Sequence, residues 1–203
     1  MGAVKELRFS CTRCGNCCTD KSTIVNTTYL DIIRIVSGLN LNIEETLEVL
    51  GFYLLDQEMN DYKLEKMVIS PVNTEKGLAF MGLIKNHDGD CFFYDSVKKK
   101  CSIYSLRPGF CKTFPFSFKE VESKGSKRKI EIFYTEKGKQ YCPGINSDSP
   151  IINKDYWENL AITILSELKK NEIFISKWNK SVKMGIVKPT VRSLIERIFK
   201  LIN

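Results

Sequence analysis

The chemistry of this sequence rests on eight cysteines, four of which are crowded near the N-terminus. These four are Cys11, Cys14, Cys17 and Cys18. A cysteine at every third position allows successive thiolates to converge on one centre, as in the C-x2-C-x2-C loops of bacterial ferredoxins. In those loops the fourth ligand comes from a distant part of the chain. Because Cys18 follows Cys17 directly, the two side chains tend to diverge, so Cys18 could serve a second centre or approach the first from another side.

The other four cysteines are spread through the middle of the chain. They are Cys91, Cys101, Cys111 and Cys142. Eight thiols are stoichiometric for two four-cysteine sites, and we predict that all eight are metal ligands. One partition joins the first three cysteines to one distant cysteine and leaves Cys18 with the remainder. Other partitions satisfy the spacing equally well.

Thiolates bind both zinc and iron–sulfur clusters, so the two must be compared. The tight cysteine run resembles ferredoxins, whereas zinc ribbons use two separated C-x2-C knuckles. The single histidine, His87, nearly excludes mixed Cys/His zinc sites. Many aromatic residues lie near the cysteines, and dry apolar surroundings tune the potential of a cluster. We therefore predict one or two iron–sulfur clusters of the 4Fe-4S type, with structural zinc as the alternative.

The composition is that of an ordinary globular protein. The chain has 203 residues, of which 43% are hydrophobic and 27% charged, enough for one compact domain with or without a helical appendage. The first ten residues include Lys5, Glu6 and Arg8 and contain no apolar signal region. We find no apolar stretch long enough to span a bilayer. We therefore expect a cytoplasmic protein with no membrane partner, in which free thiols bind metal rather than form four disulfides.

Helical patterns flank the cysteine-rich middle of the chain. Thr28 is a suitable cap for a helix that continues through Ser37 and stops at Gly38. Asn42 opens a second helix that carries Leu50 on its apolar stripe. After Cys142-Pro143-Gly144 no further cysteine occurs, and two amphipathic helices are predicted. Their ranges are 154–171 and 190–202.

Short strands fill the region between these helices. Alternating and β-branched residues predict strands at 63–70, 78–85, 91–95, 116–122 and 130–135. Turn-forming residues separate them at 86–89 and 123–126. Prolines and a glycine prevent a long helix within 101–115. The fold class is therefore α+β: a small, irregular, cysteine-rich metal-bound domain over 1–146 with short antiparallel strands, followed by a helical C-terminal extension over 147–203.

The cysteine motifs resemble those of a known family, the YkgJ-type cysteine-cluster proteins, which are described as zinc- or iron-chelating. The resemblance spans roughly residues 8 to 146. It is carried by Cys11-x2-Cys14-Gly15-x-Cys17-Cys18, by Gly89-Asp90-Cys91, by Cys101-Ser102-Ile103-Tyr104-x2-Arg107-Pro108-x2-Cys111-x2-Phe114-Pro115, and by Cys142-Pro143-Gly144. It implies metal binding at all eight cysteines but specifies no activity. Flagellin lysine methylases carry a related cysteine pattern, which adds a methylase-like enzyme component to the alternatives. Against independent methylation, the chain lacks a C-x3-C-x2-C radical motif and a glycine-rich nucleotide loop.

Three residues between the cysteines are candidates for supporting the metal centre. Arg107 could donate hydrogen bonds to cluster sulfurs or to a bound acid, and it could equally tie down its loop through backbone carbonyls. Pro108 would fix the turn that presents Cys111. Tyr104 belongs to the aromatic residues expected to shield the centre. We predict no catalytic residue, because His87 lies in a polar turn without a nucleophile beside it.

The net charge of +7 and the cysteine pattern leave three classes of function. The first is an iron–sulfur protein in electron transfer, or an accessory subunit of a larger redox or activation assembly that docks protein partners. The second is a structural zinc module that contacts protein or nucleic acid. The third is the methylase-like enzyme component. Lysines cluster at 98–100 and 124–129, which we interpret as solvated hairpin tips rather than a nucleic-acid surface.

Overall fold

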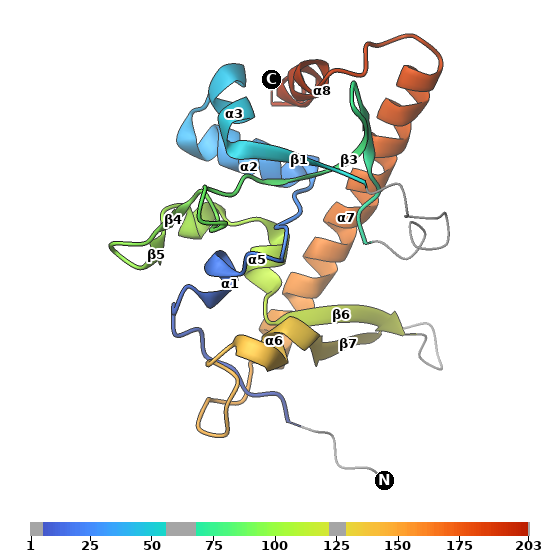
Figure 1. Ribbon diagram of the computed structural model, residues 1–203. Coiled ribbons are helices and arrows are strands. Elements are labelled where there is room, and N and C mark those ends of the chain that lie inside the picture. The colour runs from blue at the N-terminus through green and yellow to red at the C-terminus, as the bar shows by residue number, and fades with distance from the viewer. Residues whose placement is uncertain (1–5, 56–67, 122–128, 203) are drawn as a thin grey trace.

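The computed structural model describes residues 6–55, 68–121 and 129–202 (Figure 1). Its helices are α1 (Asn16–Thr19), α2 (Tyr29–Leu39), α3 (Ile43–Val49), the 3₁₀ helix η1 (Tyr104–Leu106), α5 (Gly109–Thr113), α6 (Glu136–Tyr141), α7 (Lys154–Lys183) and α8 (Val191–Phe199). Its strands are β1 (Leu50–Leu54), β2 (Val72–Thr74), β3 (Gly77–Leu83), β4 (Tyr94–Asp95), β5 (Lys100–Cys101), β6 (Phe116–Val121) and β7 (Lys129–Tyr134). The fold is α+β with short antiparallel strands, as the sequence predicted.

The strands form three small antiparallel sheets at different places in the molecule. β1, β3 and β2 form one sheet in that order, while β4–β5 and β6–β7 are separate hairpins. The registers are Leu50↔Leu83 for β1–β3, Val72↔Ala79 for β2–β3, Tyr94↔Cys101 for β4–β5 and Phe116↔Tyr134 for β6–β7. In Figure 1 the three-stranded sheet lies with α2, α3 and α8 at one end, and β6–β7 lies with α6 at the other.

The long helix α7 connects these two ends. It contacts β7 near its start and α5, α2 and β2 further along, and then leads to α8 (Figure 1). The sequence predicted a helix ending at residue 171, which is too short. Asn171 does not end the helix, because its buried side chain accepts a hydrogen bond of 2.9 Å from the first amide of α2, at Tyr29. No described helix is both long and apolar enough to cross a bilayer.

The N-caps predicted at Thr28 and Asn42 are present, and each proves to be part of a capping box. Thr28 accepts a hydrogen bond from the Asp31 amide, and Asp31 accepts one from the Thr28 amide. The expected stop at Gly38 is wrong, because α2 continues to Leu39 and ends on Asn40 with a φ of 54°. Gly38 serves a close contact instead: a Cβ at this position would collide with the Leu106 side chain.

Several predicted strands are confirmed and others differ. The strands at 78–85, 116–122 and 130–135 correspond to β3, β6 and β7. Only two residues of 91–95 form a strand, and 63–70 lies mostly outside the described residues, with β2 starting at Val72. The turn at 123–126 also lies outside them. Leu50 begins β1 rather than continuing the second helix, because Gly51 disfavours a helix interior and Phe52 and Tyr53 favour an extended chain.

The principal core lies between α2, the three-stranded sheet, the second half of α7, and α8. Trp178 is 1% exposed and its indole Nε1 donates a 3.0 Å hydrogen bond to the Asn73 carbonyl. Asn179 accepts from the Asn73 amide and donates to the Pro71 carbonyl. The buried aliphatic residues around them include Ile32, Ile35, Val72, Met81, Ile175, Leu194, Ile195 and Ile198. The division at residue 146 stays a prediction.

Candidate metal centre

The segment before the first cysteine is attached to a distant part of the chain. Arg8 forms an antiparallel bridge with Ile151, and its backbone amide and carbonyl both bind the Tyr134 hydroxyl, at 2.6 and 2.7 Å. The Ser10 amide donates to the Gly144 carbonyl at 3.1 Å. The cysteine loop therefore begins beside the segment that follows Cys142.

The loop then turns sharply to present its last two thiols from the one-turn helix α1. Gly15 has a φ of 84°, a conformation that favours glycine, and a Cβ there would also collide with the Tyr94 ring. The Cys18 amide donates to the Gly15 carbonyl at 2.7 Å. The Cys91 amide in turn donates to the Cys18 carbonyl at 2.8 Å, so the middle of the chain joins the loop directly.

The remaining thiols come from separate elements. Cys101 ends β5, opposite Tyr94 of β4, and Cys111 lies in α5. Cys142 is the C-cap of α6, where its amide donates to the Gly138 carbonyl at 3.0 Å. Cys11, Cys14 and Cys17 are exposed, Cys91 is buried, and the others are half-buried.

The thiols can be grouped by which other cysteines affect the pKa of each one. The pKa of Cys111 is raised well above its ordinary value, first by burial and then by the charges of Cys91, Cys17 and Cys101. The pKa of Cys18 is raised first by its hydrogen bond with Cys17, then by burial and by the charges of Cys17, Cys91 and Cys101. We refer to Cys18, Cys91, Cys101 and Cys111 as the inner thiols.

The second group lies toward the N-terminal loop. Burial raises the pKa of Cys142, and the charges of Cys14, Cys11 and Cys17 raise it further. We refer to Cys11, Cys14 and Cys142 as the outer thiols. Cys17 interacts with both groups. The sequence left this partition open, and these interactions favour the partition that joins Cys11, Cys14 and Cys17 to Cys142 and leaves Cys18 with the remainder.

The thiols of Cys17 and Cys18 lie close enough to interact with each other. Their Sγ atoms lie 4.0 Å apart. The hydrogen bond from Cys18, opposed by burial, lowers the pKa of Cys17 to about 7, while the same contact raises that of Cys18. Cys17 therefore holds the thiolate of the pair.

This assignment predicts a specific order of alkylation in the metal-free protein. Cys17 reacts increasingly as the pH rises through about 7, because only the thiolate is nucleophilic. Cys91 and Cys101, whose pKa values are raised first by burial, react only at higher pH. Iodoacetamide labelling across pH, quantified by peptide mass spectrometry, measures each midpoint. Cys18→Ala should move the Cys17 midpoint upward, and equal midpoints for Cys17 and Cys101 would contradict the assignment.

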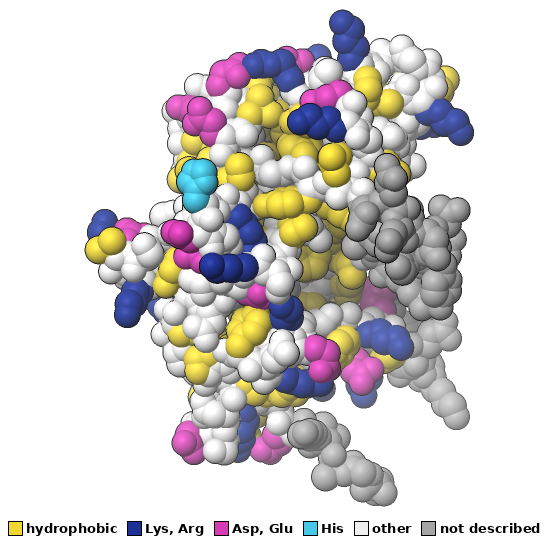
Figure 2. Space-filling model, viewed as in Figure 1, with side chains coloured by type: hydrophobic (Ala, Val, Ile, Leu, Met, Phe, Trp, Pro, Cys, Tyr) yellow, Lys and Arg dark blue, Asp and Glu magenta, His cyan; other side chains and the backbone are white. Residues whose placement is uncertain are grey.

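A cavity of about 520 Å³ extends from the thiols into the molecule. Six cysteines line it: Cys11, Cys17, Cys18, Cys91, Cys101 and Cys111. Its apolar wall comes from α5, β6 and α7 and includes Phe110, Phe118, Ile164, Leu165 and Leu168. Figure 2 shows hydrophobic side chains gathered in the hollowed middle of this face, between the three-stranded sheet and the β6–β7 hairpin.

Arg107 lies at this cavity, where it ties down its own loop through a backbone carbonyl. Its Nε donates a 3.0 Å hydrogen bond to the Tyr104 carbonyl, and its guanidinium lies 3.7 Å from the centre of the Tyr104 ring. Its charge also lowers the pKa of Cys101, against the larger effect of burial. Arg13 lies over the same ring at 4.8 Å, and no described carboxylate pairs with either arginine. Pro108 is the residue before α5, the helix that carries Cys111.

Asp31 is a supporting residue that the sequence reasoning missed. Its side chain is 1% exposed, and its Oδ1 accepts a 2.9 Å hydrogen bond from the Gly109 amide at the start of α5. The same carboxylate pairs with Arg34, which also pairs with Glu167 of α7. Its position three residues after Thr28 was the available signal, since it completes the capping box. Asp31 thereby fixes the position of α5.

The donor set suits a thiolate-bound metal. Within 6–55, 68–121 and 129–202, no three His, Cys, Asp or Glu side chains surround a common point as closely as ligands of one ion do. Six of the eight thiols instead line the cavity, and His87 is exposed in its turn. Soft thiolates select zinc, copper(I) and iron–sulfur clusters, so the residues present fit either zinc or an iron–sulfur cluster.

Among the comparisons with known proteins, the family model agrees with this chemistry. A sequence model named CxxCxxCC, described as "Putative zinc- or iron-chelating domain", matches residues 10–143. An uncharacterized protein of Methanocaldococcus jannaschii is 25% identical over 158 residues, covering 78% of this chain and 69% of that protein. A ribonuclease Z of Prochlorococcus marinus is 30% identical over 126 residues, covering 55% of this chain and 40% of that protein. No solved structure matches.

Proposed function

The chain belongs to the CxxCxxCC family of zinc- or iron-chelating domains, and from this membership we propose that it is an iron–sulfur protein. In this proposal the inner thiols hold one 4Fe-4S cluster. Cys11, Cys14, Cys17 and Cys142 hold a second. The protein acts in electron transfer, or as an accessory subunit of a larger redox or activation assembly. Its free thiols suit a reducing compartment such as the cytoplasm.

The observation that carries the choice of iron over zinc is the cavity bordered by six thiols. A zinc ion lies about 2.3 Å from each of four thiolates, which then close tightly around it. A space of about 520 Å³ suits a group of several atoms better than one ion. Arg13 and Arg107, which no described carboxylate neutralises, offset the negative charge of thiolates and cluster.

A bound 4Fe-4S cluster supplies reversible one-electron transfer, and its potential follows from its surroundings. The residues here shield the site with aromatic side chains and place positive charge beside it. The β4–β5 turn lies next to Cys101 and offers a contact for a protein partner. Val97 is 90% exposed there, between Asp95 and the three lysines at 98–100.

A second candidate function is favoured by the depth of the same cavity. Its apolar wall on α7 lies beyond the thiols, which is where an organic substrate of an enzyme component could bind. A structural zinc module would leave this space without a role. Binding of a substrate beside the metal would distinguish an enzyme component from an electron carrier.

Metal analysis of protein purified without oxygen tests the proposal. We expect about four or eight irons per chain with matching acid-labile sulfide, and a broad visible absorption band that bleaches with dithionite. Iron for two clusters would support the full assignment. One or two zinc ions with no visible band would instead make the chain a structural or chelating module and exclude electron transfer.

A further inference from the structure

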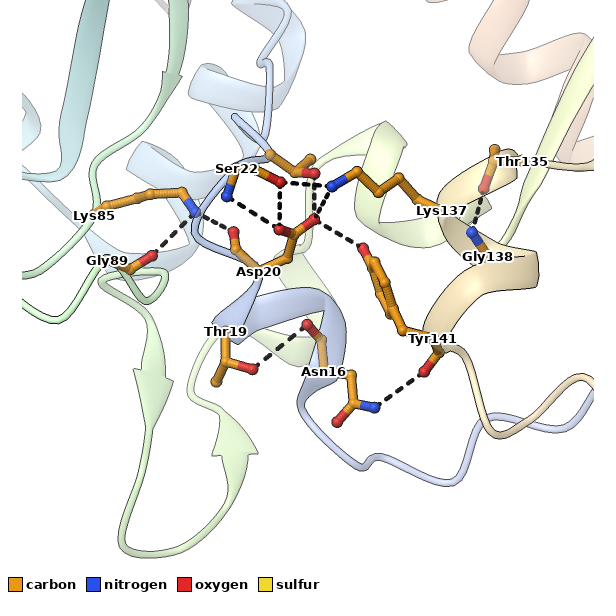
Figure 3. A network of polar contacts seen from close by, with 11 residues as sticks. Asn16, Thr19, Asp20, Ser22, Lys85, Gly89, Thr135, Lys137, Gly138 and Tyr141 are labelled. Atoms are coloured by element: carbon orange, nitrogen blue, oxygen red, sulfur yellow. Dashed lines mark hydrogen bonds and ion pairs between the residues drawn. The ribbon is translucent and has the colours of Figure 1, made fainter.

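The carboxylate of Asp20 joins the end of the cysteine loop to α6 (Figure 3). Its Oδ1 accepts hydrogen bonds from the Ser22 amide at 3.0 Å and the Ser22 hydroxyl at 2.7 Å. Its Oδ2 accepts from the Thr23 hydroxyl, from Lys137 Nζ at 3.0 Å and from the Tyr141 hydroxyl at 3.2 Å. The carboxylate therefore binds its own turn and a segment more than a hundred residues away.

The two partners on α6 are placed to act together. Lys137 and Tyr141 are four residues apart, so they lie on one face of the helix. Tyr141 immediately precedes Cys142, and its carbonyl accepts a further 3.0 Å hydrogen bond from the Asn16 side chain. Cys142 thus follows a residue that is held to the cysteine loop at both ends, through its hydroxyl and its backbone (Figure 3).

The backbone of Asp20 makes a second connection, toward the inner thiols. Its carbonyl accepts a hydrogen bond from Lys85 Nζ, which also donates to the Gly89 carbonyl at 3.0 Å (Figure 3). Gly89 lies in the turn that leads into Cys91, whose amide donates to Cys18. One residue therefore contacts the segment before Cys91 through its backbone and the segment before Cys142 through its side chain.

The burial of this network distinguishes it from an ordinary surface ion pair. The Asp20 side chain is 12% exposed, whereas that of Lys137 is 43% exposed. Hydrogen bonds to a charged and shielded carboxylate are stronger than neutral ones, and an exposed ion pair contributes little. Lys139 provides the contrast: it lies on the same helix and pairs only with Glu136, which is 88% exposed.

We propose that Asp20 is a positioning residue for the metal centre, whose carboxylate sets the place of α6 and so of Cys142 relative to the N-terminal thiols. This inference rests on the proposed metal-binding role of the cysteines. The Asp20 side chain affects the positions of the outer thiols and leaves those of the inner thiols unchanged. The contacts around Cys91 depend on the Asp20 backbone, which substitution leaves in place.

The first test measures zinc release from the zinc-loaded full chain to the chelator 4-(2-pyridylazo)resorcinol. Loss of a group that orients a metal ligand typically costs roughly 10- to 100-fold in affinity. We expect Asp20→Ala and Lys137→Met to speed release of the outer zinc by roughly that factor, and Asp20→Asn by less because its amide oxygen still accepts. Lys139→Met is the matched control and should release zinc at the unaltered rate.

The second test needs no metal and so separates this inference from the proposed function. The metal-free chain is treated with diamide, and disulfides are mapped by mass spectrometry. Asp20→Ala should sharply lower the yield of disulfides between Cys142 and Cys11 or Cys14, while disulfides between Cys91 and Cys101 form as before. If no zinc or iron binds but this difference appears, the positioning stands and the metal-binding role is overturned.

Two outcomes would overturn the positioning role itself. One is equal disulfide yields in Asp20→Ala, Lys137→Met and Lys139→Met. The other is a uniform loss of both disulfide classes with the circular dichroism spectrum unchanged, since the carboxylate would then act on the whole site. If Asp20→Ala does not fold, Lys137→Met and Tyr141→Phe decide, because each removes only one partner of the carboxylate.

Discussion

Replacing Cys142 with serine is expected to remove about half of the bound metal and to leave the other half in place. The thiol charges that raise the pKa of Cys142 are those of Cys14, Cys11 and Cys17. Those that raise the pKa of Cys111 come from Cys91, Cys17 and Cys101. A serine hydroxyl is a poor substitute for a thiolate at a zinc or iron–sulfur centre. Only the centre that contains Cys142 should therefore be lost.

The corresponding substitution among the inner thiols provides the control. Cys101→Ser should remove the other half of the metal, and the double variant should bind almost none. Metal per chain is measured by plasma mass spectrometry on anaerobically purified protein. A single substitution that empties both centres, or that leaves the metal content unchanged, would show that the thiols are not divided in this way. Cys17 is unsuitable for this test because it interacts with both groups.

Replacing Trp178 with alanine should lower the free energy of unfolding by about 3–5 kcal/mol. The side chain is 1% exposed and packs in the principal core between α7 and the neighbouring sheet and helices. Its removal leaves a cavity and also strips the Asn73 carbonyl of the indole hydrogen bond. Because the free energy of unfolding of small proteins is only about 5–15 kcal/mol, this single substitution should remove a large part of the stability.

Urea denaturation followed by circular dichroism measures the effect. Trp178→Phe keeps most of the apolar contact and should lose less, while Ile162→Ala on the same helix is the surface control, because Ile162 is 56% exposed. A loss for Trp178→Ala no larger than that for Ile162→Ala would contradict the position assigned to Trp178 in the core.

Local patterns predicted the parts of the fold that local interactions decide. The N-caps at Thr28 and Asn42 occur as expected, since each needs only residues within one turn. The helix predicted to end at residue 171 continues, because the buried Asn171 side chain accepts from the distant Tyr29 amide, which local sequence does not reveal. The helix end predicted at Gly38 is wrong for a similar reason, because the contact of Gly38 with Leu106 joins segments far apart in the sequence.

The candidate site likewise combines features that local sequence predicts with features that depend on distant parts of the chain. Spacing alone indicated that the cysteines of 11–18 could share a centre, and the family membership agrees with metal binding. The grouping of Cys142 with the outer thiols depends on α6, a helix that the sequence reasoning did not predict. Asp20 has no sequence signal of its own, because nothing near it in the chain reveals Lys137 and Tyr141 as its partners.

The attachment of Arg8 to Tyr134 and Ile151 has a consequence for biosynthesis. Arg8 and Tyr134 are 126 residues apart, and ribosomes add roughly 5–20 residues per second. The N-terminal thiols therefore leave the ribosome on the order of ten seconds before the segment that completes their surroundings. During that interval the nascent loop holds three exposed cysteines without Cys142. A centre that includes Cys142 therefore cannot form until most of the chain has been translated.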